Sequence, residues 1–271
     1  MNGDYEYLRE LHEYLLRMMV EFRQICEKLN INFYLAGGTL LGAVRHQGFI
    51  PWDDDVDLAM FRNDYNTLIS YFKDKEIEGY SLSCYQTNPD NELLFGKLIC
   101  HKPVPESLRT FCNSDGHITI DILPVDSCSS KKSMKKAINA YRIKALKGIA
   151  KSKKYYSLYK DAGLKLTPSK FFRVVIGYLF KIIDTKKIIG VAVDIAEKGY
   201  DKNSKCTVAY MSKYNHKRET HLRSDWEPGV LLKFEDQFFL APVHYEIILK
   251  TTYGDDWNVI PDEKNRIQHK H

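Results

Sequence analysis

Two aspartates separated by a single residue, Asp55 and Asp57, are the part of this sequence best suited to chemistry. They begin a segment, 55–61, in which acidic and apolar residues alternate as in a strand whose two faces meet different surroundings. Side chains two positions apart on a strand point to the same face, so the two carboxylates would lie side by side and repel each other without a cation. Hard oxygen ligands favour Mg²⁺ or Mn²⁺, which take their remaining ligands from water and phosphate oxygens.

A glycine pair, Gly37 and Gly38, lies between a short apolar segment, 31–36, that predicts a buried strand and a predicted helix over 39–46. Because glycine has no Cβ and a helix start is electropositive, backbone N–H groups at this turn can hold phosphate. A third acid, Asp121, lies in a later apolar segment that also predicts a strand. The glycine pair, the acid-x-acid strand and the later acid are together typical of the nucleotidyltransferase superfamily.

The segment GGTLLGAVRHQGFIPWDDDVDLAM, residues 37–60, resembles the signature of the LicD family. Members of that family are phosphocholine transferases and relatives that modify bacterial surface polysaccharides, and they are similar to the fukutin-related sugar phosphotransferases. Other segments also resemble the family, namely ICEKLNINFYLAGGTLLGAVRH (25–46), LLFGKL (93–98), ITIDILPVD (118–126) and LAPVHYEIILKTTYGDDW (240–257). Residues 131–205 show little resemblance to it.

The resemblance implies a Mg²⁺- or Mn²⁺-dependent transfer of a phospho-alcohol, such as phosphocholine, from a CDP-activated donor. The acceptor would be a sugar hydroxyl of a cell-surface glycan or its lipid-linked precursor, and CMP would leave. Asp55, Asp57 and Asp121 would be the catalytic and metal-binding residues, with Asp121 either completing the metal shell or taking the proton of the hydroxyl. The expected phosphate-binding residues are Gly37, Gly38 and Thr39.

Four further residues are predicted to bind substrate. Lys97 and Arg45 could balance charge on the phosphates, and Trp52 and Tyr34 are the aromatic residues nearest the motif, suited to hold a choline ammonium by cation–π contact. Lys97 and Arg45 suit an ordinary ion-pair or surface role equally well. After Lys97 the sequence reads LICHKPVP where the family has a polar segment with Asn-Thr, so the resemblance determines the reaction more closely than the substrate.

Two alternatives to this function remain at this point. A nucleotidyltransferase that transfers the nucleotide itself would release pyrophosphate in place of CMP. A basic binding module could keep the same fold without catalysis, although an intact set of three acids argues against it.

The expected fold is α+β, a nucleotidyltransferase-like mixed sheet flanked by helices, with a basic helical insertion. The predicted divisions are a catalytic core over 1–130, the insertion over 131–205 and a C-terminal segment over 206–271 that packs back on the core. The predicted elements are helices over 5–29, 39–46 capped by Thr39, 63–73 capped by Asn63 and 242–253, strands over 31–36, 55–61, 80–86, 93–101 and 117–123, and a hairpin over 231–240.

Charge is distributed unevenly along the 271 residues, whose net charge is +5. Residues 131–190 hold 17 Lys and Arg against two acids, so this segment is +15 and the rest of the chain is −10. Lys-rich helices are most often simply solvated. A nucleic-acid surface is disfavoured because Arg is scarce. Residues 169–183, with 10 apolar residues of 15 and cations at both ends, suit a peripheral membrane contact and suit burial in the protein core equally well.

The expected location is cytoplasmic, with peripheral contact at the inner face of the membrane. No run of about 18 uncharged apolar residues is present, and the N-terminal segment lacks the apolar stretch of a secretory signal. Six scattered cysteines without a C-x-x-C pair fit reduced thiols. The nearest approach to a zinc motif matches no standard finger, and it consists of Cys100, His101, Cys112, His117 and Cys128.

Overall fold

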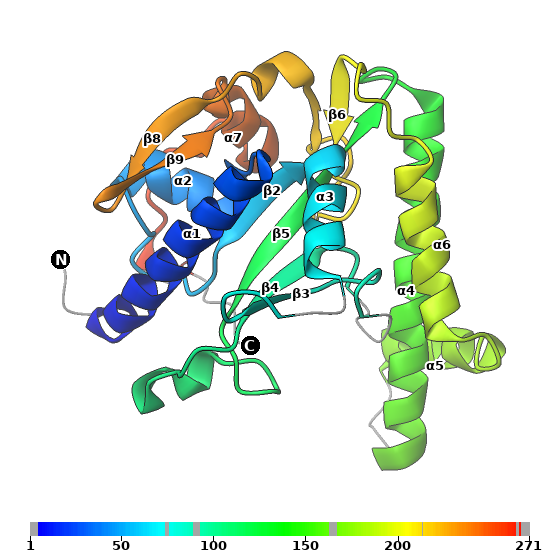
Figure 1. The fold of residues 1–271 in the computed structure, drawn as a ribbon. Coiled ribbons are helices and arrows are strands. Elements are labelled where there is room, and N and C mark those ends of the chain that lie inside the picture. The colour runs from blue at the N-terminus through cyan, green and yellow to red at the C-terminus, as the bar shows by residue number, and fades with distance from the viewer. Residues whose placement is uncertain are drawn as a thin grey trace.

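The computed structural model describes residues 5–73, 76–88, 93–162, 167–212, 214–263 and 266. A mixed sheet flanked by helices forms the body, and a group of long helices stands at one side of it (Figure 1). The predicted α+β class with a mixed sheet is confirmed. Within the described residues no helix is both long and apolar enough to cross a bilayer.

The main sheet consists, in spatial order, of β1 (Tyr34–Leu35), β2 (Asp57–Phe61), β5 (Thr119–Cys128), β4 (Gly96–Cys100) and β3 (Tyr80–Ser83). β2 and β5 run parallel, and the other neighbouring pairs on this path are antiparallel. The last residues of β5 pair with β6 (Cys206–Val208), which pairs with β7 (Thr220–Leu222). The predicted hairpin is present as β8 (Val230–Phe234) and β9 (Gln237–Ala241).

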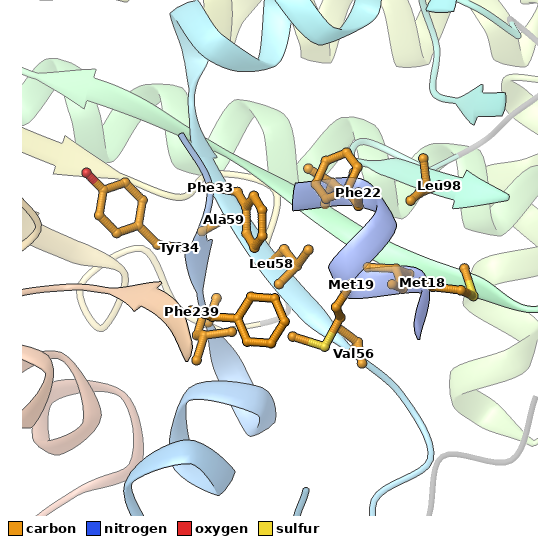
Figure 2. Packing of buried hydrophobic residues seen from close by; sticks show 14 of the residues in the cluster. Met18, Met19, Phe22, Phe33, Tyr34, Val56, Leu58, Ala59, Leu98 and Phe239 are labelled. Carbon is orange, nitrogen blue, oxygen red and sulfur yellow. The ribbon is translucent and has the colours of Figure 1, made fainter. Parts of the chain in front are cut away.

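Helix α1 (Arg9–Leu29) covers the sheet with one apolar face, and a 3-10 turn (Glu6–Leu8) precedes it. Its buried residues recur at spacings of three and four and include Leu11, Leu15, Met18, Phe22 and Ile25. Figure 2 shows Met18, Met19 and Phe22 around Leu58 of β2. The other helices of the body are α2 (Gly37–His46), α3 (Arg62–Phe72) and α7 (Tyr245–Tyr253).

The predicted insertion contains α4 (Met134–Ala162), α5 (Pro168–Leu179) and α6 (Thr185–Glu197). A second hydrophobic cluster joins α4 and α6 to the extension of the sheet, and its members include Ile143, Ala150, Ile188, Ala192, Cys206 and Val208. This cluster is separate from the main core, so the insertion has its own apolar contacts with β5 and β6.

A buried ion pair links the body to the insertion. Arg62 of α3 donates to both carboxylate oxygens of Asp126 on β5, at 2.7 and 3.1 Å, and its Nη1 lies 3.5 Å from Oε1 of Glu197 on α6. The side chains of Arg62 and Asp126 are 2% and 0% exposed. Such a two-bond pairing compensates charges that would be costly to bury alone.

Several details of the sequence prediction are wrong, among them the start of the helix predicted at residue 242, which begins at Tyr245. Thr39 and Asn63 cap no helix, because α2 already begins at Gly37 and α3 at Arg62. The strand predicted to end at residue 123 continues to Cys128. Pro124 and Asp126 are unusual strand residues, but Arg62 compensates the buried Asp126 and allows the strand to continue.

Candidate active site

Two acidic side chains and one basic side chain lie in a row across the neighbouring strands β2, β5 and β4. The parallel register of β2 and β5 aligns Asp57 with Asp121, and the antiparallel register of β4 and β5 aligns Lys97 with Asp121. Lys97 Nζ lies 2.5 Å from Asp121 Oδ1, and the two side chains are about a quarter exposed, at 25% and 21%. The predicted residues Asp57, Asp121 and Lys97 are therefore neighbours although they lie far apart in the sequence.

A cavity of about 250 Å³ adjoins this row. Asp55, Asp57 and Asp121 all line it, together with Gly37 at the start of α2. The remainder of its wall is mainly apolar or aromatic and includes Leu123, Val125, Phe95, Met211, Trp226 and Ile248. The cavity thus combines an acidic end with an apolar wall, a combination common in small-molecule sites.

The glycine pair fits closely against the acids. Gly37 has φ +50°, a left-handed conformation that favours glycine, and a Cβ placed on it would lie 2.2 Å from Asp57 Oδ2. A Cβ on Gly38 would lie 2.6 Å from Asp53 Oδ2. A larger residue at either position would displace a carboxylate. The start of α2 therefore packs directly against the acidic segment.

The backbone of Asp57 is held on both sides by the same turn. Ala36 N–H donates to the Asp57 carbonyl at 3.1 Å, and Asp57 N–H donates to Thr39 Oγ1 at 2.9 Å. The Thr39 side chain is buried. In this structure its hydroxyl therefore positions Asp57, while its predicted contact with phosphate stays a prediction.

The donor chemistry of the acidic end fits a hard divalent cation. Asp55, Asp57 and Asp121 line one cavity, but the described part of the chain contains no group of three or more His, Cys, Asp or Glu that could hold a metal ion. Mg²⁺ is commonly bound by one or two carboxylates plus substrate phosphates, without a closed protein cage. The three aspartates therefore suit a cation that takes its other ligands from the phosphates of a substrate. Among the described residues, the cysteines and histidines near residue 100 likewise form no group of three that could hold a metal ion such as zinc.

Trp52 and Arg45 are predicted substrate residues that do not line the cavity. Trp52 is buried, and the guanidinium carbons of Arg45 and Arg266 lie 5.8 and 4.6 Å from the centre of its ring. Arg45 Nη1 donates to the carbonyl of Val259, and burial lowers the pKa of Arg45. The ring of Trp52 is thus already in contact with cations of the chain itself.

Tyr34 also lies outside the cavity wall. Its ring is buried, 3% exposed, and packs edge-on against Phe61 and Trp226, with ring centroids 5.7 and 5.6 Å away. Its contacts are those of a core aromatic residue that supports Trp226, which does line the cavity.

The sequence analysis missed His221 and Trp226 in the cavity wall. His221 is 2% exposed, and in the part of the chain that the structure describes neither of its ring nitrogens nor Trp226 Nε1 has a hydrogen-bond partner. Burial lowers the pKa of His221 to about 4, although the nearby Asp225 opposes this. The imidazole is therefore neutral at pH 7, with one nitrogen able to donate and the other to accept. No sequence signal marks it, because only the pairing of β7 with β6 brings it here.

The family comparison matches the segment that carries the acids. Residues 30–145 fit the family model described as LicD/FKTN/FKRP, nucleotidyltransferase domain. We call these residues, which make up less than half of the chain, the LicD segment, after the family to which they are similar. The LicD segment contains the glycine pair, the three aspartates and Lys97, whereas His221 and Trp226 lie outside it.

Among the curated relatives of the chain are two proteins that are transferases by name. A 75-residue stretch is 41% identical to the lipopolysaccharide cholinephosphotransferase LicD of Haemophilus influenzae and covers 28% of each chain. A 57-residue stretch is 40% identical to the ribitol 5-phosphate transferase FKRP of Homo sapiens, covering 21% of this chain and 10% of that protein. The chain thus aligns with only a small part of the length of these curated relatives.

Proposed function

We propose that the chain is a transferase that moves a phospho-alcohol from a CDP-activated donor to a sugar hydroxyl of a cell-surface glycan or its lipid-linked precursor. Phosphocholine is the first candidate alcohol, Mg²⁺ or Mn²⁺ the cofactor and CMP the leaving group. One observation carries the proposal, namely that three aspartates of the LicD segment, Asp55, Asp57 and Asp121, line a single cavity. The relatives support the reaction class, since their names describe the transfer of choline phosphate and of ribitol 5-phosphate.

In the proposed reaction the acceptor oxygen bonds to the phosphorus that carries the alcohol. The bond from this phosphorus to the bridging oxygen breaks, and CMP leaves with the electron pair. Asp55 and Asp57 would hold the cation at the donor phosphates. A bound Mg²⁺ would neutralise phosphate charge and orient the phosphate oxygens. The protein would otherwise contribute positioning and electrostatics.

Lys97 and Asp121 would act as a pair. The Asp121 carboxylate, which lines the cavity, is suited to accept the proton of the sugar hydroxyl or to complete the metal shell, and Lys97 contacts it from the neighbouring strand. Lys97 can also balance charge on the donor phosphates when these enter. Gly37 and Gly38 would let the phosphates approach the backbone at the start of α2.

The alcohol would bind at the aromatic part of the cavity. Phe95, Tyr214 and Trp226 line the cavity together with the Glu219 carboxylate, and such a set suits a quaternary ammonium. Trp52 and Tyr34 are less suited to that role because neither lines the cavity. The neutral His221 and the Trp226 N–H would bind an uncharged polar part of a substrate, since a buried polar group without a partner costs free energy.

Product analysis tests the proposal. We expect CDP-choline, CDP-glycerol or CDP-ribitol to raise the melting temperature in the presence of Mg²⁺, and the protecting donor to yield CMP when a glycan acceptor is added. Release of pyrophosphate from a nucleoside triphosphate would establish the nucleotidyltransferase alternative instead. Absence of both protection and turnover with every CDP-alcohol would favour the binding module.

A further inference from the structure

Helix α5 exposes its apolar side to solvent. Phe171, Phe172 and Leu179 are 52%, 66% and 68% exposed, and Ile182 just beyond the helix is 90% exposed. At 100° per residue these positions fall on one side of the helix. Soluble proteins normally turn such a stripe towards their core, so an uncovered one marks an interaction site.

The opposite side of α5 is the one that packs on α4. A Cβ on Gly177 would lie 2.3 Å from the carbonyl oxygen of Ser152, so the two helices approach very closely there. Arg173, on the same side, places its guanidinium carbon 5.1 Å from the centre of the Tyr155 ring. Figure 1 shows α5 on the side of α4 away from the sheet. The close crossing therefore holds α5 with its apolar side outwards.

Strong positive charge surrounds this apolar side. Residues 131–190 carry a net charge of +15, and exposed cations near the stripe include Lys170, Lys181, Lys186 and Lys187. A second copy of the chain would bring the same charge against it, which disfavours self-association through this face. Nucleic acid would satisfy the cations but leave Phe172, Leu179 and Ile182 without an apolar partner. Anionic lipid offers both negative headgroups and an apolar layer.

We propose that α5 with residues 180–183 is a membrane-binding element that lies flat at an anionic lipid surface. Phe172, Leu179 and Ile182 would insert at the level of the headgroups and upper acyl chains, and the lysines would contact the anionic headgroups. This inference depends on the α4–α5 contact and the exposed stripe, and it holds whichever group the cavity transfers.

Vesicle flotation of the full chain tests the proposal. We expect binding to phosphatidylcholine vesicles that contain phosphatidylglycerol, and much weaker binding to phosphatidylcholine alone. The double variant Phe172→Ser/Leu179→Ser should lower the partition coefficient at least about tenfold. The matched control is Leu231→Ser/Phe238→Ser on the β8–β9 hairpin, which removes the same two residue types at 63% and 55% exposure and should leave vesicle binding unchanged.

Three results would overturn the proposal. One is equal binding of the α5 variant and the wild type, and another is equal loss in the α5 and hairpin variants. The third is a wild-type chain that forms a stable dimer in solution, ignores anionic vesicles and becomes monomeric when Phe172 and Leu179 are changed. Circular dichroism and melting curves would establish that all variants fold. The α5 variant should release CMP with a soluble acceptor as the wild type does. Failure of the membrane-binding proposal is therefore distinguishable from failure of the proposed reaction.

Discussion

Gly37 and Asp57 are fitted to each other so closely that a Cβ on the glycine would lie 2.2 Å from the aspartate Oδ2. The φ of +50° at Gly37 adds backbone strain to any substitution. We predict that Gly37→Ala displaces the Asp57 carboxylate and lowers kcat/KM for CMP release at least about 10²-fold, at a stability cost of about 1–2 kcal/mol. Gly148→Ala in α4 is the control, because its Cβ would meet nothing within 4 Å. Normal kinetics in Gly37→Ala would separate the turn from catalysis.

Loss of one acidic charge at the cavity should abolish turnover without unfolding the chain. Asp55→Asn and Asp57→Asn keep the size of the side chain but remove the charge that the proposed cation needs. We expect undetectable CMP release from each, with melting temperatures within a few degrees of the wild type. Asp256→Asn changes an exposed aspartate and should be silent in both measurements. Retained activity in both site variants would exclude the acidic pair from the mechanism.

Lys97 and Asp121 should behave as a coupled pair. We predict that Asp121→Asn and Lys97→Met each lower kcat at least about 10²-fold, and that the double variant loses less than the product of the two effects. Stability should change little, because both side chains are partly exposed and such pairs contribute about 1 kcal/mol or less. A double-mutant cycle on kcat measures the coupling. Strictly multiplicative effects would show that the two groups act independently.

His221 should make the protein less stable in mild acid. Its imidazole takes a proton near pH 6.5 in the unfolded chain but only near pH 4 when folded, so its stabilising contribution is complete above pH 6.5 and is lost as the pH falls towards 4. At pH 5 the expected loss is about 2 kcal/mol. Urea unfolding at pH 7 and pH 5 should show this loss in the wild type but not in His221→Leu. Equal pH dependence in the two proteins would contradict the prediction.

Removing Arg62 alone should lower the free energy of unfolding more than removing Arg62 together with its partner Asp126. Arg62→Met leaves the fully buried Asp126 without its ion pair, and we expect a loss of about 3–5 kcal/mol in the free energy of unfolding. Arg62→Met/Asp126→Leu removes both charges and should recover most of that loss. Denaturant titration measures both variants. A double variant no more stable than Arg62→Met would show that packing, and not the buried charge, dominates.

Much of the acidic end of the cavity could be predicted from the sequence because most of its residues lie close together along the chain. Asp55 and Asp57 are two residues apart on a strand, and Gly37 lies at a strand-to-helix turn, so simple periodicity gives their mutual geometry. Asp121 required the pattern of a known superfamily, since its place beside Asp57 depends on strand pairing. The prediction for Trp52 used nearness in the sequence alone, and the structure buries its ring outside the cavity wall.

The apolar wall could not be predicted from the sequence. His221 reaches the cavity through β7, which pairs with β6, and β6 in turn pairs with the end of β5 far away along the chain. Strands of three residues leave almost no periodic signal. Trp226 could not be predicted to line the cavity either, because the residues that pack against it, Tyr34 and Phe61, come from distant segments.

The parallel pairing of β2 with β5 also affects how the chain can be made. During synthesis β2 emerges well before its neighbour, since α3, β3 and β4 are translated between them. Until β5 arrives, one edge of β2 lacks its hydrogen-bonding partner and β4 has no strand to join it to the rest of the sheet. A ribosome-bound fragment that ends before residue 119 should therefore be prone to aggregation and dependent on chaperones.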